Sequence, residues 1–286
     1  MSVVRFEKDG RIARIILNRP ELMNAIDLAM PQEIEDAVKR ADTDPDIHVM
    51  ILSGAGAGFC AGYDLNVFAA EKGPNLGFQD MPWDPIKDYT FMWRNTQHFM
   101  SLWRAMKPVI CKVHGFAVAG GSDIALCADL TFMAEQAQIG YMPSRVWGCP
   151  TTAMWVYRLG AEKAKRMMFT GDKITGIEAE RMGLILKAVP EQDLDDAVEA
   201  MASRMASVPI NQLAMQKMVI NQAIEQTGLM QTQRLATIFD GITRHSPEGV
   251  NFKRRSQDMG WKHTVEERDQ GTFDWTTNEP IPKPSR

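Results

Sequence analysis

The alternation of apolar and polar positions predicts that the chain opens with paired strands. Two apolar stretches between Val3 and Asn18 flank Asp9-Gly10, a dipeptide that strongly marks hairpin turns. Apolar residues at helical spacing then predict a helix from Asp27 to Arg40, followed by a strand from His48 to Ser53.

The middle of the chain continues this alternation. We expect a helix that begins near Tyr63, a longer helix from Lys87 to Met106, and strands from Pro108 to His114 and from Leu130 to Ala134. Strands and helices that alternate in this way indicate an α/β fold with crossover connections.

The last third of the chain shows a different pattern. Residues 189–255 have helical periodicity without a clear strand, whereas the chain beyond Trp261 is charged and then proline-rich. The latter composition predicts an extended tail over the surface or onto a neighbouring subunit. We therefore expect a core over residues 1–190, a helical subdomain over 191–260 and a tail over 261–286.

Composition excludes several classes of protein. The chain has 286 residues, 45% of them hydrophobic, and its apolar runs are shorter than the ~20 residues of a membrane-spanning helix. No secretory signal is visible, so we expect a cytoplasmic protein without a membrane partner. The net charge of −4 gives no basic footprint for nucleic acid. The four cysteines form no metal-ligand pattern, so no metal site is expected.

Two glycine-bearing segments carry the candidate chemistry. Gly58 to Leu65 and His114 to Asp123 each follow an expected strand and lead into an expected helix. The first N–H groups of a helix are unpaired, and the helix dipole is positive there. Two such turns that converge on one carbonyl oxygen form an oxyanion hole, which stabilises negative charge on an enolate or a tetrahedral intermediate.

Rival motifs fit these segments poorly. A dinucleotide-binding G-x-G-x-x-G that starts at Gly54 needs glycine where Phe59 stands, and no Gly-Lys-Ser/Thr phosphate loop follows. A nucleophile elbow around Ser122 needs glycine where Ile124 stands.

The ordered set of motifs resembles the crotonase superfamily, the enoyl-CoA hydratase/isomerase family. The resemblance spans roughly residues 3–255 and rests on the following segments: Asn18-Arg19-Pro20, Asn24-Ala25, Phe59 to Leu65, Gly115 to Asp123, Gly140 to Pro143, and Gly148-Cys149-Pro150. It implies a spiral of ββα units with a helical C-terminal trimerisation subdomain. It also implies acyl-CoA thioester substrates, no separate cofactor, and a homotrimer or homohexamer.

The same resemblance implies roles for individual residues. The backbone N–H groups of Tyr63 and Gly120 would form the oxyanion hole, and Asp123 matches the first of the family's two catalytic glutamates. An acid at this position also suits the helix N-terminus, so capping is the alternative role for Asp123. The matched candidates for the substrate groove and the acyl pocket are Met23, Ala25, Ala61, Gly62, Asp64, Leu65, Pro143, Ser144 and Trp147.

The second catalytic glutamate of the family has no counterpart here. An ungapped alignment places Pro143 at its position and Ser144 beside it, and neither is a carboxylic acid. The polar groups that can substitute are Tyr141, Arg145, Asp240, Arg244, His245 and Glu248. We therefore predict an enoyl-CoA hydratase, with two enzymatic alternatives: a single-carboxylate isomerase, and a thioester or carbon–carbon hydrolase. A non-catalytic acyl-CoA binder is the alternative from another class.

Overall fold

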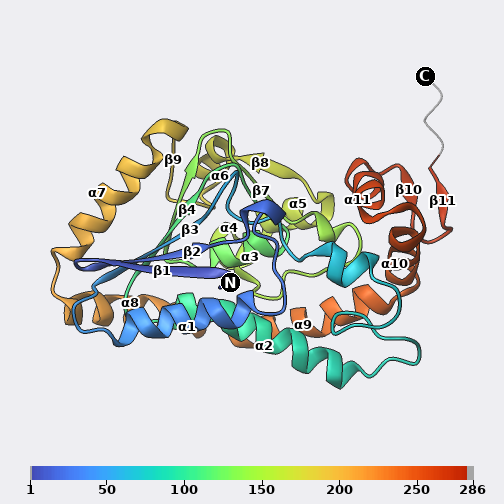
Figure 1. Ribbon diagram of the computed structural model, residues 1–286, viewed down its shortest axis with the longest axis horizontal. Helices are drawn as coiled ribbons and strands as arrows, with labels where there is room; N and C mark the ends of the chain where they lie inside the picture. The colour runs from blue at the N-terminus through green and yellow to red at the C-terminus, as the bar shows by residue number, and fades with distance from the viewer. Residues whose placement is uncertain (1, 282–286) are drawn as a thin grey trace.

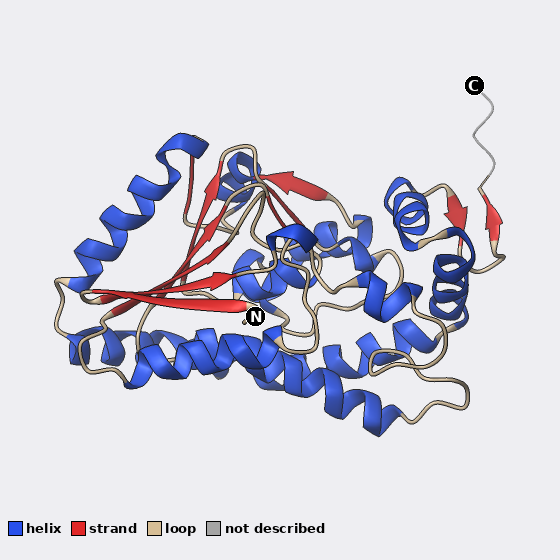
Figure 2. Ribbon diagram, viewed as in Figure 1, coloured by secondary structure: helices blue, strands red, loops and turns tan. Residues whose placement is uncertain are grey.

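A six-stranded sheet forms the centre of the protein, for which the computed structural model describes residues 2–281 (Figure 1, with strands in red in Figure 2). The strand order is β1-β2-β3-β4-β6-β9; β1 and β2 pair antiparallel, and all later neighbours pair parallel. The strands are β1 (Val4–Asp9), β2 (Ile12–Leu17), β3 (Val49–Gly54), β4 (Val109–Val113), β6 (Leu130–Ala134) and β9 (Lys187–Val189).

The protein also contains a three-stranded sheet, whose first strands each follow a strand of the six-stranded sheet along the chain. Its strands are β5 (Phe116–Val118), β7 (Gln138–Gly140) and β8 (Lys173–Thr175). β5 directly follows β4, and β7 directly follows β6, so the strands from β4 to β7 alternate between the two sheets. An isolated parallel bridge from Cys60 to Ala117 continues this arrangement for the chain that follows β3. Successive turns of the chain are therefore stacked ββα units.

Helices cover the sheets and extend to one end of the molecule (Figure 1). They are α1 (Met30–Thr43), α2 (Pro85–Arg104), α3 (Gly120–Leu126), α4 (Met154–Leu159), α5 (Ala161–Thr170), α6 (Gly176–Met182), α7 (Leu194–Ala206), α8 (Ile210–Glu225), α9 (Leu229–His245), α10 (Pro247–Met259) and α11 (Trp261–Gln270). Helices α1 and α7 pack on the six-stranded sheet.

Short elements complete the chain. They are 3₁₀ turns at Pro20–Leu22, Met142–Ser144 and Glu191–Asp193, a π-helical turn at Asn66–Ala70, and a hairpin of β10 (Phe273–Asp274) and β11 (Glu279–Pro280). No helix within residues 2–281 is both long and apolar enough to span a bilayer.

The hydrophobic core has two parts. The larger part fills the space between the sheets and helices, where the interior strands β3 and β4 are almost continuously apolar, as parallel strands covered on both faces are. The smaller part is aromatic and surrounds Phe252 of α10, which stacks against Trp147 and contacts Trp275 beyond α11. This aromatic cluster holds the C-terminal segment against the body of the protein.

Most sequence-based elements are confirmed within a few residues. The N-terminal hairpin, the first helix, the two central strands and the helical region after residue 189 all form. The helix expected to begin near Tyr63 is present only as the short π-helical turn, which begins three residues later at Asn66. Backbone hydrogen bonds from Ile26 N–H to Gly62 C=O (2.8 Å) and from Asp64 N–H to Ile26 C=O (3.0 Å) hold the chain at Tyr63 extended, and only the π-helical turn follows it.

The C-terminal segment also differs from expectation. Residues 261–270, expected as part of an extended tail, form helix α11, and the chain then turns back in the β10–β11 hairpin. The helix went unrecognised because its inward face combines Trp261 and Val265 with buried Thr264 and Arg268, which gives no apolar periodicity. The proline-rich end at residues 282–286 lies outside the described residues.

Candidate active site

The two glycine turns come into direct contact. A Cβ added to Gly121 would lie 2.3 Å from the carbonyl oxygen of Cys60, and a Cβ on Gly62 would lie 3.2 Å from the backbone nitrogen of Gly120. Gly62 also has φ +91°, a left-handed conformation that favours glycine. The small residues are therefore needed for the close approach of two backbone segments.

Each turn contributes a backbone N–H group without a protein acceptor. Within residues 2–281, neither the N–H of Tyr63 nor that of Gly120 donates a hydrogen bond, whereas the N–H of Ala119 donates to Gly140 C=O at 2.9 Å. Gly120 is the first residue of α3, where no intrahelical acceptor exists. Both residues line one cavity.

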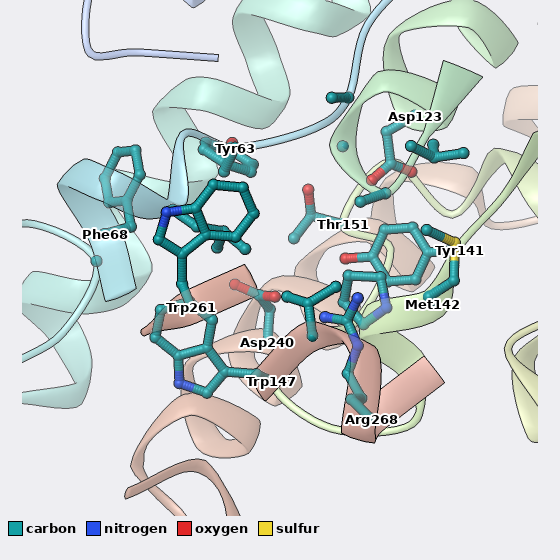
Figure 3. A pocket seen from close by; sticks show the side chains of 18 of the residues that line it. Tyr63, Phe68, Asp123, Tyr141, Met142, Trp147, Thr151, Asp240, Trp261 and Arg268 are labelled. Atoms are coloured by element: carbon teal, nitrogen blue, oxygen red, sulfur yellow. The ribbon is translucent and has the colours of Figure 1, made fainter. Parts of the chain in front are cut away.

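This cavity has a volume of about 460 Å³ and a mainly apolar wall (Figure 3). Its aromatic apolar side chains are Phe68, Phe91, Phe99, Phe116, Trp147 and Trp261, and Met92 and Met142 add to them. A few polar groups interrupt this wall: Asp123, Tyr141, Thr151, Asp240, Arg244, Arg268, Gln138 and Lys173. A concave, mainly apolar wall with a small number of polar groups is typical of a site for a small organic molecule.

Asp123 is the carboxyl group on the helix that Gly120 begins. Its side chain is 5% exposed, and its Oδ1 accepts a hydrogen bond of 2.7 Å from Thr152 Oγ1. Burial raises the pKa of Asp123 to about 8, against the opposing effect of the Thr152 hydrogen bond. No backbone N–H of α3 within the described chain donates to this carboxyl, so capping does not account for it. A carboxyl group with this pKa can both release and accept a proton near neutral pH.

Asp240 is a second carboxyl group in the cavity wall, but its oxygens are occupied. Oδ1 accepts from the backbone N–H of Cys149 at 3.0 Å, and Oδ2 accepts from Arg244 Nη2 at 2.9 Å. Arg244 in turn donates to Asp88 at 2.8 Å. Asp240 is therefore a fixed part of a buried ion network that joins α9 to α2.

The position that matches the family's second glutamate lies at the wall of the cavity. Pro143, in the 3₁₀ turn after β7, lines the cavity. Ser144 is absent from the cavity wall, and its hydroxyl donates to the carbonyl of Tyr141 at 2.8 Å. Of the six groups named as substitutes, Tyr141, Asp240 and Arg244 line the cavity.

The structure brings together most of the residues named from the sequence. Those that line the cavity are Met23, Ala61, Tyr63, Leu65, Gly120, Asp123, Pro143 and Trp147. Ala25, Gly62, Asp64 and Ser144 are not part of its wall. Asp64 instead forms an ion pair of 3.1 Å with Arg19, which links the Asn18-Arg19-Pro20 motif to the first glycine turn.

Two residues of the site were missed. Thr152 follows Thr151 in a loop before α4, and no motif in the sequence marks its contact with Asp123. Arg268 lies in the charged run that was interpreted as a tail. An arginine seven residues after Trp261 and three after Val265 shares one face of a helix with them, which is the only signal that the sequence offers.

Comparison with known proteins agrees with the motif order. The family model described as "Enoyl-CoA hydratase/isomerase" matches residues 7–263. The chain is 30% identical to a probable mitochondrial enoyl-CoA hydratase of Dictyostelium discoideum, over 86% of this chain and 85% of that protein. It is 28% identical to a 1,2-epoxyphenylacetyl-CoA isomerase of Escherichia coli, over 82% of this chain and 86% of that protein.

A solved structure extends the likeness to three dimensions. A crystal structure of an enoyl-CoA hydratase from Mycobacterium smegmatis superposes with a TM-score of 0.89 at 44% sequence identity, and the match covers 95% of each chain. The spiral of ββα units with a helical C-terminal region is thus the fold of this protein.

Proposed function

Because this chain belongs to the enoyl-CoA hydratase/isomerase family, we propose that it is an enoyl-CoA hydratase with Asp123 as its acid and base. The observation that carries the proposal is the buried Asp123 carboxyl, whose pKa is raised to about 8. It lies in the same cavity that Tyr63 and Gly120 line. The thioester is the substrate, and the proposed reaction uses no separate cofactor.

The proposed mechanism places the thioester carbonyl oxygen on the N–H groups of Tyr63 and Gly120. As water adds to the β-carbon, negative charge develops on this oxygen, and two preorganised donors in a largely apolar cavity stabilise it. Asp123 accepts the proton of the attacking water and delivers a proton to the α-carbon. One carboxyl group thus serves both steps in turn.

Double-bond isomerisation is the second candidate activity, and one observation favours it. Asp123 and Asp240 are the only carboxyl groups in the cavity wall within residues 2–281, and Asp240 is bound to Arg244. An isomerase needs a single group that removes a proton from one carbon and returns it to another, so the loss of the second glutamate does not impair this reaction.

The decisive experiment compares two substrates that differ in the position of the double bond. A hydratase converts 2-enoyl-CoA to 3-hydroxyacyl-CoA and incorporates oxygen from labelled water. An isomerase converts 3-enoyl-CoA to 2-enoyl-CoA without label. Release of free CoA or a shortened acyl chain would indicate the hydrolase alternative, and tight binding without turnover would reject the enzymatic proposal in favour of the acyl-CoA binder.

We also propose that the protein assembles as a homotrimer or homohexamer through the helices of residues 191–260. Supporting this, α8 and α9 carry exposed apolar side chains within the described chain: Met215, Met218, Val219, Ile220, Leu235, Ile238, Phe239 and Ile242. Apolar surfaces of this kind commonly mark protein interfaces. Light scattering coupled to gel filtration tests the assembly, and a monomer at micromolar concentration would reject it. The expected cytoplasmic location stays a prediction.

A further inference from the structure

Helix α11 places an arginine in the wall of the cavity. Arg268 is 5% exposed, and Figure 3 shows its guanidinium directed toward the space between Tyr141 and Asp240. Its Nε donates to Asp269 Oδ1 at 2.8 Å, and its guanidinium carbon lies 5.7 Å from the ring centroid of Phe252. Within residues 2–281, its Nη1 and Nη2 atoms donate no hydrogen bond.

The terminal nitrogens of Arg268 are charged donors in the cavity wall. Burial lowers the pKa of Arg268, but a guanidinium stays protonated in proteins, so the charge remains. Because Arg268 lines the cavity, a ligand that fills the cavity would displace the water around its terminal nitrogens and would have to supply acceptors in place of that water. Residues 2–281 supply no acceptor for the Nη atoms of Arg268, so these atoms are available to a ligand.

The other charged groups of the cavity wall, apart from Lys173, already have hydrogen-bond partners within the protein. Asp240 accepts from Cys149 N–H and from Arg244, and Asp123 accepts from Thr152. Tyr141, in contrast, lines the cavity, and its hydroxyl forms no hydrogen bond to another group of residues 2–281. Burial keeps the pKa of Tyr141 well above its ordinary value, so this hydroxyl is a neutral donor. Arg268 and Tyr141 thus form a group of unused donors beside each other.

We propose that the acyl group of the substrate carries a carboxylate remote from the thioester, and that Arg268 binds this carboxylate through Nη1 and Nη2 with Tyr141 as an additional donor. The proposal rests on the acyl-CoA function proposed above. A planar guanidinium with two parallel donors matches a carboxylate, and such paired hydrogen bonds are about twice as strong as neutral ones.

The arrangement of the cavity agrees with a remote carboxylate. In Figure 3, the Asp123 carboxyl lies above Tyr141 and the Arg268 guanidinium lies below the Tyr141 hydroxyl. An acyl chain whose reacting carbons lie beside Asp123 would therefore direct its far end toward Arg268. Arg268 lies in α11, five residues after residue 263, where the match to the family model ends.

Binding of unreactive thioesters tests the inference without turnover. Saturated acyl-CoA thioesters from succinyl-CoA to suberyl-CoA are each compared, by calorimetry, with the monocarboxylic thioester of equal length. We expect at least one length at which the terminal carboxylate tightens binding by about tenfold to a hundredfold, the range of a charged hydrogen-bond pair. Equal or weaker binding of the carboxylated member at every length would overturn the inference.

Substitutions then assign the preference to one residue. Arg268→Met should abolish the preference for the carboxylate, and Arg268→Lys, which keeps the charge without the planar fork, should retain a part of it. Arg145→Met is the matched control, because Arg145 is an exposed neighbouring cation outside the cavity wall. A preference that survives in Arg268→Met, or that Arg145→Met removes equally, would count against Arg268.

The two proposals fail separately in this design. A wild-type protein that binds the carboxylated thioesters preferentially but turns over no enoyl-CoA would refute the hydratase and isomerase assignments and leave the Arg268 inference intact. A protein that turns over enoyl-CoA but does not discriminate between paired thioesters would refute only the Arg268 inference.

Discussion

Thr152 Oγ1 donates a hydrogen bond of 2.7 Å to Asp123 Oδ1, and within residues 2–281 the Asp123 carboxyl accepts no other hydrogen bond. The bond favours the ionised form of the carboxyl, whereas burial favours the neutral form and dominates. The pKa of about 8 therefore results from burial and the charge of Asp240, which raise it, and from the Thr152 hydroxyl, which lowers it.

Removal of this hydroxyl should move the pH dependence of turnover. Thr152→Val removes the donor, which raises the pKa of Asp123 further and shifts the pH midpoint of kcat upward by about one unit. Thr131→Val is the control, because Thr131 donates to Ala125 C=O in the core and does not line the cavity. An unchanged midpoint in Thr152→Val would show that another group governs the profile.

Asp123→Asn should lower turnover and raise the stability of the folded protein. We expect turnover to fall by about 10²-fold or more, because asparagine cannot transfer the proton. The folded protein holds the Asp123 proton up to about pH 8, while an unfolded aspartate releases it near pH 4. Between these values the folded state binds more protons, so the stability of the wild type falls as pH rises.

The stability gain of Asp123→Asn should therefore grow with pH. Thermal unfolding at about pH 5 and about pH 9 measures it, and the melting temperature of the variant should exceed that of the wild type by more at the higher pH. A difference that is constant across this interval would mean that Asp123 is already ionised at the lower pH.

The parts of the site that depend on backbone geometry were predictable from the sequence. Gly62 and Gly120 stand in motifs whose small residues indicate the close approach of two turns. Asp123 lies three residues after Gly120, in the helix that the second motif begins. The strands that carry these turns were also predictable, because interior parallel strands such as β3 and β4 are continuous apolar runs.

The parts that depend on contacts distant in sequence were not predictable. Thr152 reaches Asp123 across 29 residues, and Arg244 reaches Asp88 across 156. Neither contact leaves a local pattern. The extended conformation at Tyr63 arises from pairing with Ile26, a tertiary contact that overrides local preference.

The ion network beside the cavity should be important for stability. Arg244 is 6% exposed and lies within 2.9 Å of both Asp88 and Asp240, so Arg244→Met leaves two buried carboxylates without their cation. We expect the free energy of unfolding in urea to fall by about 3–5 kcal/mol. Lys187→Met, which breaks the exposed pair with Glu180, should cost less than about 1 kcal/mol. Equal effects of the two variants would contradict this assignment.

Gly62→Ala should impair the proposed oxyanion hole. The new methyl group would lie 2.7 Å from the Cβ of Ala119 and 3.2 Å from the nitrogen of Gly120, which forces the two turns apart. Loss of a well-placed donor lowers kcat by about 10²-fold or more. Gly183→Ala is the matched control, because Gly183 has a similar φ of +81° with no atom within 4 Å of the added Cβ. Wild-type turnover in Gly62→Ala would reject the proposed role of these amides.

Pro143→Glu should increase hydration of 2-enoyl-CoA if the missing carboxylate limits that reaction. Pro143 lines the cavity, so a glutamate there can reach the reacting atoms and divide the two proton transfers with Asp123. A second positioned acid or base raises the rate by about tenfold to 10²-fold or more. Ser144→Glu introduces the same carboxylate one residue away, at a position outside the cavity wall, and should give no gain. A decrease in hydration by Pro143→Glu, with 3-enoyl-CoA isomerisation unaffected, would instead favour an isomerase in which Asp123 works alone.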